Sequence, residues 1–145
     1  MKNHVLSDRD GVCTFVLVFE PGDEVIAELT AFARHHSLTA SRFTGIGAFS
    51  DVTLGFFDLD DKDYLEIPVE EQVEVLSLVG NIARGPDGQP RAHAHAVVGT
   101  RDGTARGGHL LAGRVRPTLE VILTESPGRL QRELDAATGL PLIAL

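Results

Sequence analysis

Hydrophobic and polar residues alternate along much of this chain, and such alternation is typical of β-strands that bury one face. Strand-like segments cover residues 12–19, 64–67, 74–83, 92–100, 104–112 and 118–124. Residues 39–58 alternate as well, but Gly45 and Gly47 interrupt the pattern. Glycine inside a strand often marks a bend or a close approach of another backbone. We therefore expect two strands with a sharp bend between them over residues 39–58.

Two further segments have helical spacing instead. After Pro21-Gly22, apolar residues recur every three or four positions from Val25 to about His36, with Asp23 and Glu24 at the expected helix start. Near the end of the chain, Ser126-Pro127 is typical of a helix start and Gly139 of a helix end. The sequence thus predicts an α+β fold in which a large, mainly antiparallel sheet carries two α-helices.

The chain has no internal repeat and no linker, so residues 1–145 are expected to form a single domain with a core over about residues 12–142. No apolar run reaches the ~18–20 residues of a membrane span. The N-terminus lacks the apolar run of a signal peptide. The single cysteine, Cys13, excludes an intramolecular disulfide and any multi-cysteine zinc site. These features predict a cytoplasmic protein that does not associate with membranes.

Charge argues against a nucleic-acid binder, because the formal net charge is −8 and phosphate contacts require a basic surface. The charges are also segregated along the chain. Eight acidic residues lie between Asp58 and Glu74, whereas six arginines lie between Arg84 and Arg116. These segments are either two solvated loop regions or complementary faces that meet between subunits.

The candidate chemistry lies in histidines. His93 and His95 are two residues apart in a strand-like segment, so their side chains project from the same face. Ala92, Ala94 and Ala96 then occupy the other face, where such small side chains predict tight packing.

The position of His109 depends on the turn that precedes it. A two-residue turn at Asp102-Gly103 would pair His109 with Ala96 and place it on the wrong face, because a one-residue slip exchanges the two faces. A three-residue loop from Arg101 to Gly103 would pair His109 with His95. We expect the three-residue loop, because such loops use glycine in their third position.

In that register His93, His95 and His109 converge and offer three nitrogen ligands to a divalent metal ion. Zn²⁺ with a fourth position open is the first candidate, although imidazole also suits Ni, Cu and Fe. Glu120 is an acid within an otherwise apolar strand. It is either a partner of a ligand, a fourth ligand or a general base, or else an outward-facing carboxylate paired with Arg114 or Arg116.

Several segments in this order resemble the plants-and-prokaryotes-conserved (PPC) domain. They include Thr44-Gly45-Ile46-Gly47-Ala48, His93-Ala94-His95, Gly107-Gly108-His109-Leu110 and Pro117-Thr118-Leu119-Glu120-Val121. The resemblance implies an α+β fold with a large antiparallel sheet, assembly as a homotrimer, and a metal at His93, His95 and His109. It also implies an association with DNA through the plant members, in which an AT-hook precedes the domain. This chain lacks the Arg-Gly-Arg-Pro core of that hook.

The sequence therefore favours a PPC-type protein that binds a divalent metal, most simply zinc, through three histidines. Two alternatives follow from the same residues. The first is a metal-assisted hydrolase or lyase with Glu120 as its base, and the second is a DNA-associated regulatory module.

Overall fold

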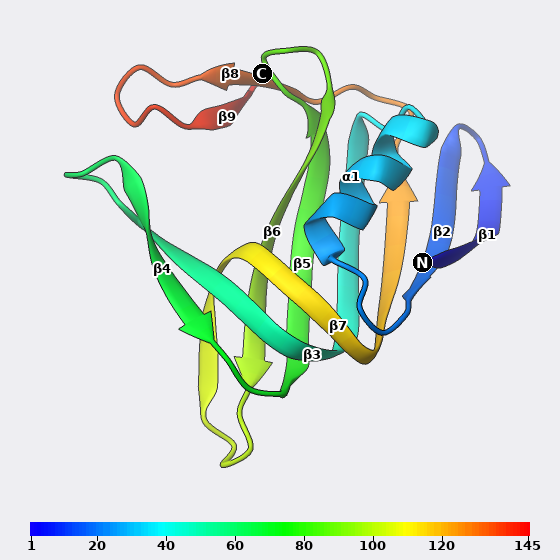
Figure 1. Cartoon of the computed structure of the whole chain (residues 1–145). Coiled ribbons are helices and arrows are strands. Elements are labelled where there is room, and N and C mark those ends of the chain that lie inside the picture. The colour runs from blue at the N-terminus through cyan, green and yellow to red at the C-terminus, as the bar shows by residue number, and fades with distance from the viewer.

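The structure, a computed structural model, describes residues 1–145 and contains one helix and nine strands (Figure 1). The helix is α1 (Val25–His35). The strands are β1 (Lys2–Arg9), β2 (Val12–Phe19), β3 (Ala40–Asp58), β4 (Asp63–Val69), β5 (Val73–Arg84), β6 (Pro90–Gly99), β7 (Ala105–Glu125), β8 (Gln131–Leu134) and β9 (Pro141–Ala144).

All nine strands belong to one sheet, in which only β5 and β8 pair in parallel. The long strands β3 and β7 pair with each other along most of their length and curve together across the molecule (Figure 1). Strand β5 pairs with β3 and β6, and β6 in turn pairs with β7. These four strands therefore form a closed circuit, which explains how a chain of this size buries a core with a single sheet.

Helix α1 packs against β6 and β7 and contributes Val25, Leu29, Phe32 and Ala33 to the core. Its N-cap is Glu24, whose carboxylate accepts hydrogen bonds from the backbone N–H groups of Ile26 and Ala27. The helix expected after Pro21-Gly22 is thus confirmed. With 11 residues it is too short to span a membrane, and it is the only helix present.

The glycine-rich segment forms one strand, β3, where two were expected. The bend is present as a break in the pairing register between Gly45 and Gly47. Gly47 has a φ of +156°, and a Cβ at this position would collide with the backbone at Thr118. Similarly, the segments expected as separate strands over residues 104–112 and 118–124 are continuous in β7. A long strand can bend at glycines or bulges without losing its pairing to a neighbour that bends with it.

The second predicted helix, after Ser126, is wrong. Its place is taken by β8 and β9, which pair as an antiparallel hairpin. The expected cap residue Gly139 instead lies in the turn, with a φ of +75°. Leu134, an apolar residue of the segment predicted as a helix, is 67% exposed. Helical spacing stabilises a helix only where a core surface receives the apolar face, and here none does.

Two hairpins extend from the same side of the closed circuit. In Figure 1 the β3–β4 hairpin and the β8–β9 hairpin both point to the left. At the opposite edge, β1 pairs with β2, so the sheet begins at Lys2, before the start of the expected core.

Gly80 in β5 provides a test of how closely the strands pack. A Cβ at Gly80 would lie under 3.0 Å from the ring of Phe43 and from the carbonyl oxygen of His93. We expect Gly80→Ala to lower the free energy of unfolding by about 1–3 kcal/mol, because overpacking forces neighbours to move. Gly128→Ala, where a Cβ meets nothing within 4 Å, is the matched control and should change it by less than ~0.5 kcal/mol. Chemical denaturation of both variants measures the difference, and equal stabilities would contradict the packing argument.

Candidate metal centre

The loop between β6 and β7 sets the register on which the histidine site depends. The backbone N–H of Thr100 donates to the carbonyl oxygen of Thr104 at 2.9 Å, and that of Gly103 donates to the carbonyl of Thr100 at 2.9 Å. Gly103 has a φ of +84°, as the third position of a three-residue loop requires. His95 consequently pairs with His109. The expected three-residue loop is confirmed.

His93, His95 and His109 come together as the sequence predicts. One potential ligand nitrogen from each imidazole lies within 4.8 Å of the others. The ring centroids are 5.0 Å apart for His93 and His109, and 5.3 Å apart for each pair that includes His95. His93 and His109 are partly buried, whereas His95 is exposed. The cluster is therefore shielded on one side and accessible on the other.

The alternation of β6 separates this cluster from the core. Ala94 and Ala96 are 1% and 2% exposed on the core face, which is the face that packs near α1. The imidazoles of His93 and His95 therefore project away from the core. The prediction of tight packing behind the histidines is confirmed for Ala94 and Ala96, whereas Ala92 is partly buried and lines the cavity described below.

The ring of Tyr64, in β4, packs against the imidazole of His109. The Tyr64 ring lies 4.7 Å from the His109 ring, between centroids, and Phe57 packs against Tyr64 at 5.1 Å. Gly55 pairs with His109 across β3 and β7, and a Cβ at Gly55 would lie 2.8 Å from Tyr64 Cδ1. The missing side chain at Gly55 thus lets Tyr64 reach across β3 to the imidazole.

Arg132 in β8 contacts the cluster at His93. Its guanidinium donates to Asn81 Oδ1 at 2.6 Å and to the Pro141 carbonyl oxygen at 2.9 Å. A third contact of 3.3 Å joins Arg132 Nη2 to Nδ1 of His93. The segment predicted as a helix therefore contributes a buried arginine to the site. Because that segment was predicted to be helical, the sequence analysis did not place Arg132 near the histidines.

The imidazoles are in an environment that favours their neutral form. Burial, together with the positive charge that His93 and His95 would carry when protonated, lowers the pKa of His109 to about 4. Burial also lowers the pKa of His93, with smaller contributions from Arg132 and His95. Neutral imidazole is the form that binds a metal, so these two ligands are available at neutral pH.

A cavity of about 430 Å³ opens beside the cluster. It lies between the two projecting hairpins and is lined by Phe57, Tyr64, Arg91, Ala92, His93, His95, His109, Arg132, Leu140, Pro141 and Leu142. The lining combines apolar side chains with arginine and histidine, and contains no carboxylate. Tyr64 and Arg132 were not singled out by the sequence analysis. The only available signal was that Tyr64 is the single tyrosine of the chain.

The other residues considered from the sequence lie elsewhere. Glu120 is exposed on β7, in register with Ile46 and Val18, and is not part of the histidine cluster or of its cavity. His36 packs on Phe32 at the end of α1, with 4.3 Å between ring centroids. Cys13 is a partly buried free cysteine.

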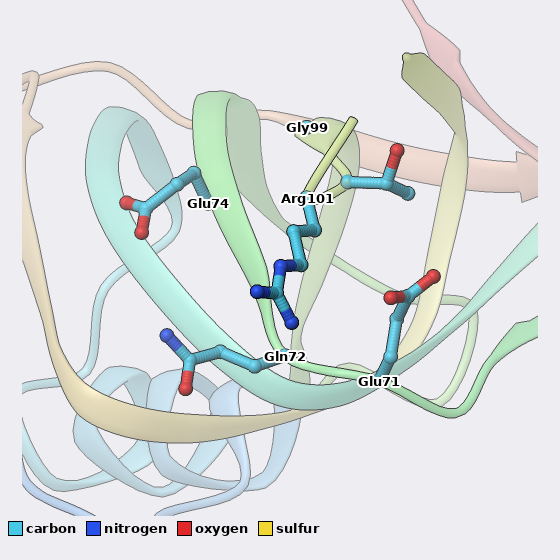
Figure 2. Close-up of a pocket in the computed structure, with 6 residues that line it drawn as sticks. Glu71, Gln72, Glu74, Gly99 and Arg101 are labelled. Atoms are coloured by element: carbon cyan, nitrogen blue, oxygen red, sulfur yellow. The ribbon is translucent and has the colours of Figure 1, made fainter. Parts of the chain in front are cut away.

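The acidic and basic segments meet within the chain at the β6–β7 loop. Figure 2 shows the Arg101 side chain among Glu71, Gln72 and Glu74, which line a polar cavity of about 480 Å³ with it. Arg91 forms an ion pair with Asp87 at 2.8 Å. Part of the positive charge of the basic segment is therefore next to acidic residues of the same chain.

Together, the fold and the site define a single-sheet domain, closed through β3, β5, β6 and β7, with a three-histidine cluster on the face away from the core. A family model described as Plants and Prokaryotes Conserved (PCC) domain matches residues 7–127. The chain belongs to this family, abbreviated PCC or PPC, and the resemblance noted from the sequence is confirmed. A search of curated proteins gives no match.

Solved structures of similar proteins agree with this assignment. A PPC protein from Pyrococcus horikoshii is 28% identical, with a TM-score of 0.86 over 99% of this chain and 95% of that chain. A metal-containing protein from Archaeoglobus fulgidus is 30% identical, with a TM-score of 0.83 over 91% and 93%. A candidate DNA-binding protein from Ralstonia eutropha is also 30% identical, with a TM-score of 0.86 over 97% and 95%.

The lowered pKa of His109 predicts an acid-dependent loss of stability in the metal-free protein. Folded His109 resists protonation until about pH 4, whereas unfolded histidine binds a proton below about pH 6.5. Protons therefore favour the unfolded chain, and the contribution of His109 is lost as the pH falls from about 6.5 to 4. Allowing for partial solvent screening, we expect a loss of about 1–2 kcal/mol.

Denaturant titrations at pH 7, 6 and 5 with a chelator present measure this effect. His109→Gln should lose less stability than the wild type over this range. The exposed His4→Gln in β1 is the control and should follow the wild type. Equal pH dependence for His109→Gln and the wild type would contradict the prediction.

Proposed function

We propose that this protein binds a divalent transition metal ion, with zinc as the first candidate, through His93, His95 and His109. The observation that carries the proposal is the convergence of three imidazole nitrogens within 4.8 Å at the edge of a cavity. Three imidazoles with an open fourth position are a common donor set for Zn²⁺. The similarity to a metal-containing protein from Archaeoglobus fulgidus supports the same conclusion.

The residues present fit a metal ion in two further respects. Nδ1 of His109 is buried and has no hydrogen-bond partner, and such atoms are rare unless something else satisfies them. In addition, the lowered pKa values of His93 and His109 keep both imidazoles neutral at physiological pH. A divalent transition metal ion can therefore bind to these two imidazoles without displacing a proton from a charged ring.

A bound metal would supply Lewis acidity to a ligand in the cavity and would make a bound water more acidic. The chain's own residues orient the imidazoles and limit access. Ala94 and Ala96 hold β6 against the core, while Tyr64 covers one face of His109. Because the cavity lining lacks a carboxylate, we favour metal binding itself over a hydrolase or lyase in which Glu120 acts as the base.

A role in DNA binding is favoured less, although two of the similar structures are those of candidate DNA-binding proteins. The net charge of −8 produces a repulsive field toward a polyanion. Arg101 lies beside Glu71 and Glu74 (Figure 2), and Arg91 is paired with Asp87. These arginines are therefore poorly placed to contribute to a basic surface for phosphate contacts.

We expect the wild-type protein, purified without chelator, to contain about one metal ion per chain by elemental analysis. Added Zn²⁺ should raise the melting temperature of the metal-stripped protein, because a ligand that binds only the folded state stabilises it. His93→Ala, His95→Ala and His109→Ala should each lower the metal content and reduce this shift.

His4→Ala is the matched control, since His4 is exposed on β1 and lies outside the cluster. It should leave metal content and the zinc-dependent shift unchanged. Metal-free wild-type protein that gains no thermal stability from Zn²⁺ would refute the proposed function.

We also propose that the chain assembles as a homotrimer, as the family resemblance implies. Large apolar side chains on the strands support association. Phe56 and Leu65 are cross-strand partners and are 61% and 54% exposed. Ile46 and Ile122 are diagonal neighbours on β3 and β7 and are also exposed. Exposed apolar pairs of this kind are favourable when another protein surface covers them.

Light scattering at micromolar concentration should accordingly give about three times the chain mass of 15.6 kDa. The same sample in denaturant is the control and should give the mass of one chain. A monomeric mass under native conditions would contradict the trimer.

A further inference from the structure

Arg132 is a buried cation without an anionic partner. The residue is 6% exposed, and its hydrogen bonds go to the side-chain oxygen of Asn81 and the carbonyl oxygen of Pro141. Its third contact is His93 Nδ1, and its Nε atom is buried with no partner at all. Charged side chains are rarely buried unless an opposite charge accompanies them. This guanidinium therefore has an uncompensated positive charge and a free N–H donor from which an anion could accept a hydrogen bond.

The surroundings supply no such anion. The cavity that Arg132 lines contains three histidines and Arg91, but neither aspartate nor glutamate. Arg91 differs from Arg132 in that it is largely exposed and pairs with Asp87. A divalent ion on the histidines would add two positive charges beside Arg132. The region would then hold three positive charges that no residue of the lining compensates.

Metal binding would also change the hydrogen bonding of Arg132. In the structure, Nδ1 of His93 can receive a hydrogen bond from Arg132 only while that nitrogen carries a free lone pair. A metal on Nδ1 would occupy the lone pair. A metal on the other ring nitrogen would leave the proton of the neutral ring on Nδ1. In both cases Arg132 loses this acceptor and has one more donor available.

The remaining walls of the cavity indicate the rest of the ligand. Phe57, Tyr64, Leu140 and Leu142 contribute apolar surface, and the volume of about 430 Å³ admits a small organic molecule. The planar fork of a guanidinium matches the two oxygens of a carboxylate. A ligand with an anionic end and an apolar body fits both parts of the cavity.

We propose that the cavity between the β3–β4 and β8–β9 hairpins binds a small organic carboxylate, which the Arg132 guanidinium holds beside the metal. This inference rests on the proposed function, because it takes the metal to be bound at the three histidines. Since the metal releases a donor of Arg132 and adds positive charge, metal and carboxylate raise each other's affinity. The coupling is reciprocal, as linkage requires.

Calorimetric titration of the zinc-loaded protein with isobutyrate tests the proposal, with the isosteric neutral isobutyramide as the comparison. Isobutyrate should bind at least ~10-fold more tightly than the amide, because only the carboxylate compensates the charge. The metal-free protein should bind isobutyrate at least ~3-fold more weakly than the zinc-loaded protein. Inorganic phosphate is titrated as the alternative oxyanion and should bind more weakly than isobutyrate.

Two arginines of the same cavity provide matched variants. Arg132→Gln should weaken isobutyrate binding at least ~10-fold, whereas Arg91→Gln should change it less than ~3-fold, since Arg91 is exposed and paired with Asp87. Circular dichroism checks that Arg132→Gln folds, because Arg132 also joins β8 to Asn81 of β5. If that variant unfolds, the proposal is tested by the comparison of isobutyrate with isobutyramide in the wild-type protein.

Zinc binding is measured separately through the fluorescence of Tyr64, which is the only tyrosine in a chain without tryptophan. Zinc binding without preference for the carboxylate over the amide, or equal isobutyrate affinity in a folded Arg132→Gln, overturns this inference and leaves the proposed function intact. Tighter binding of phosphate overturns the choice of a carboxylate. Absence of zinc binding overturns the proposed function, and the proposed coupling with it.

Discussion

The register between β6 and β7 is the constraint on which the site depends. A shift of one residue in strand pairing moves every side chain of that strand to the opposite face of the sheet. A loop one residue shorter would therefore turn His109 toward the core face. The three-residue loop closed between Thr100 and Thr104, with Gly103 at positive φ, prevents this slip. Core packing supports the same register, because Ala94 and Leu110 are buried only if His93 and His109 face outward. Local turn chemistry and burial therefore agree on one arrangement.

Around this hairpin, the absence of side chains is as important as their presence. Ala94 and Ala96 let β6 lie close to the core elements, and Gly80 lets Phe43 and the backbone of His93 approach β5. Gly55 leaves space for Tyr64 against His109. Close packing holds the backbone of the three imidazoles in place, whereas their outer side remains open to the cavity. A rigid support with an accessible face is what a binding site requires.

The cavity is completed by a segment far from the histidines in sequence. Strand β8 carries Arg132 to His93, and the β8–β9 hairpin adds the apolar residues Leu140 and Leu142 to the cavity lining. The β3–β4 hairpin supplies Phe57 and Tyr64 from the other side. Three hairpins thus form the site, and each contributes a different chemical group. The β6–β7 hairpin supplies imidazole nitrogens, the β3–β4 hairpin supplies aromatic surface, and the β8–β9 hairpin supplies a guanidinium. The site belongs to the fold as a whole and not to one motif.

The sequence by itself determined much of this protein. Alternation located the segments that form β2 to β7, and helical spacing located α1. Glycine in the third loop position predicted the register that brings His95 opposite His109. These are local features, governed by turn geometry and by the period of side-chain direction. The tertiary structure alone decided that residues 131–144 form a hairpin, because a helix there would have had no core surface to cover. It also alone decided that Arg132 and Tyr64 reach the histidines, since contacts between residues distant in sequence depend on how the strands curve and pair, which no local pattern records.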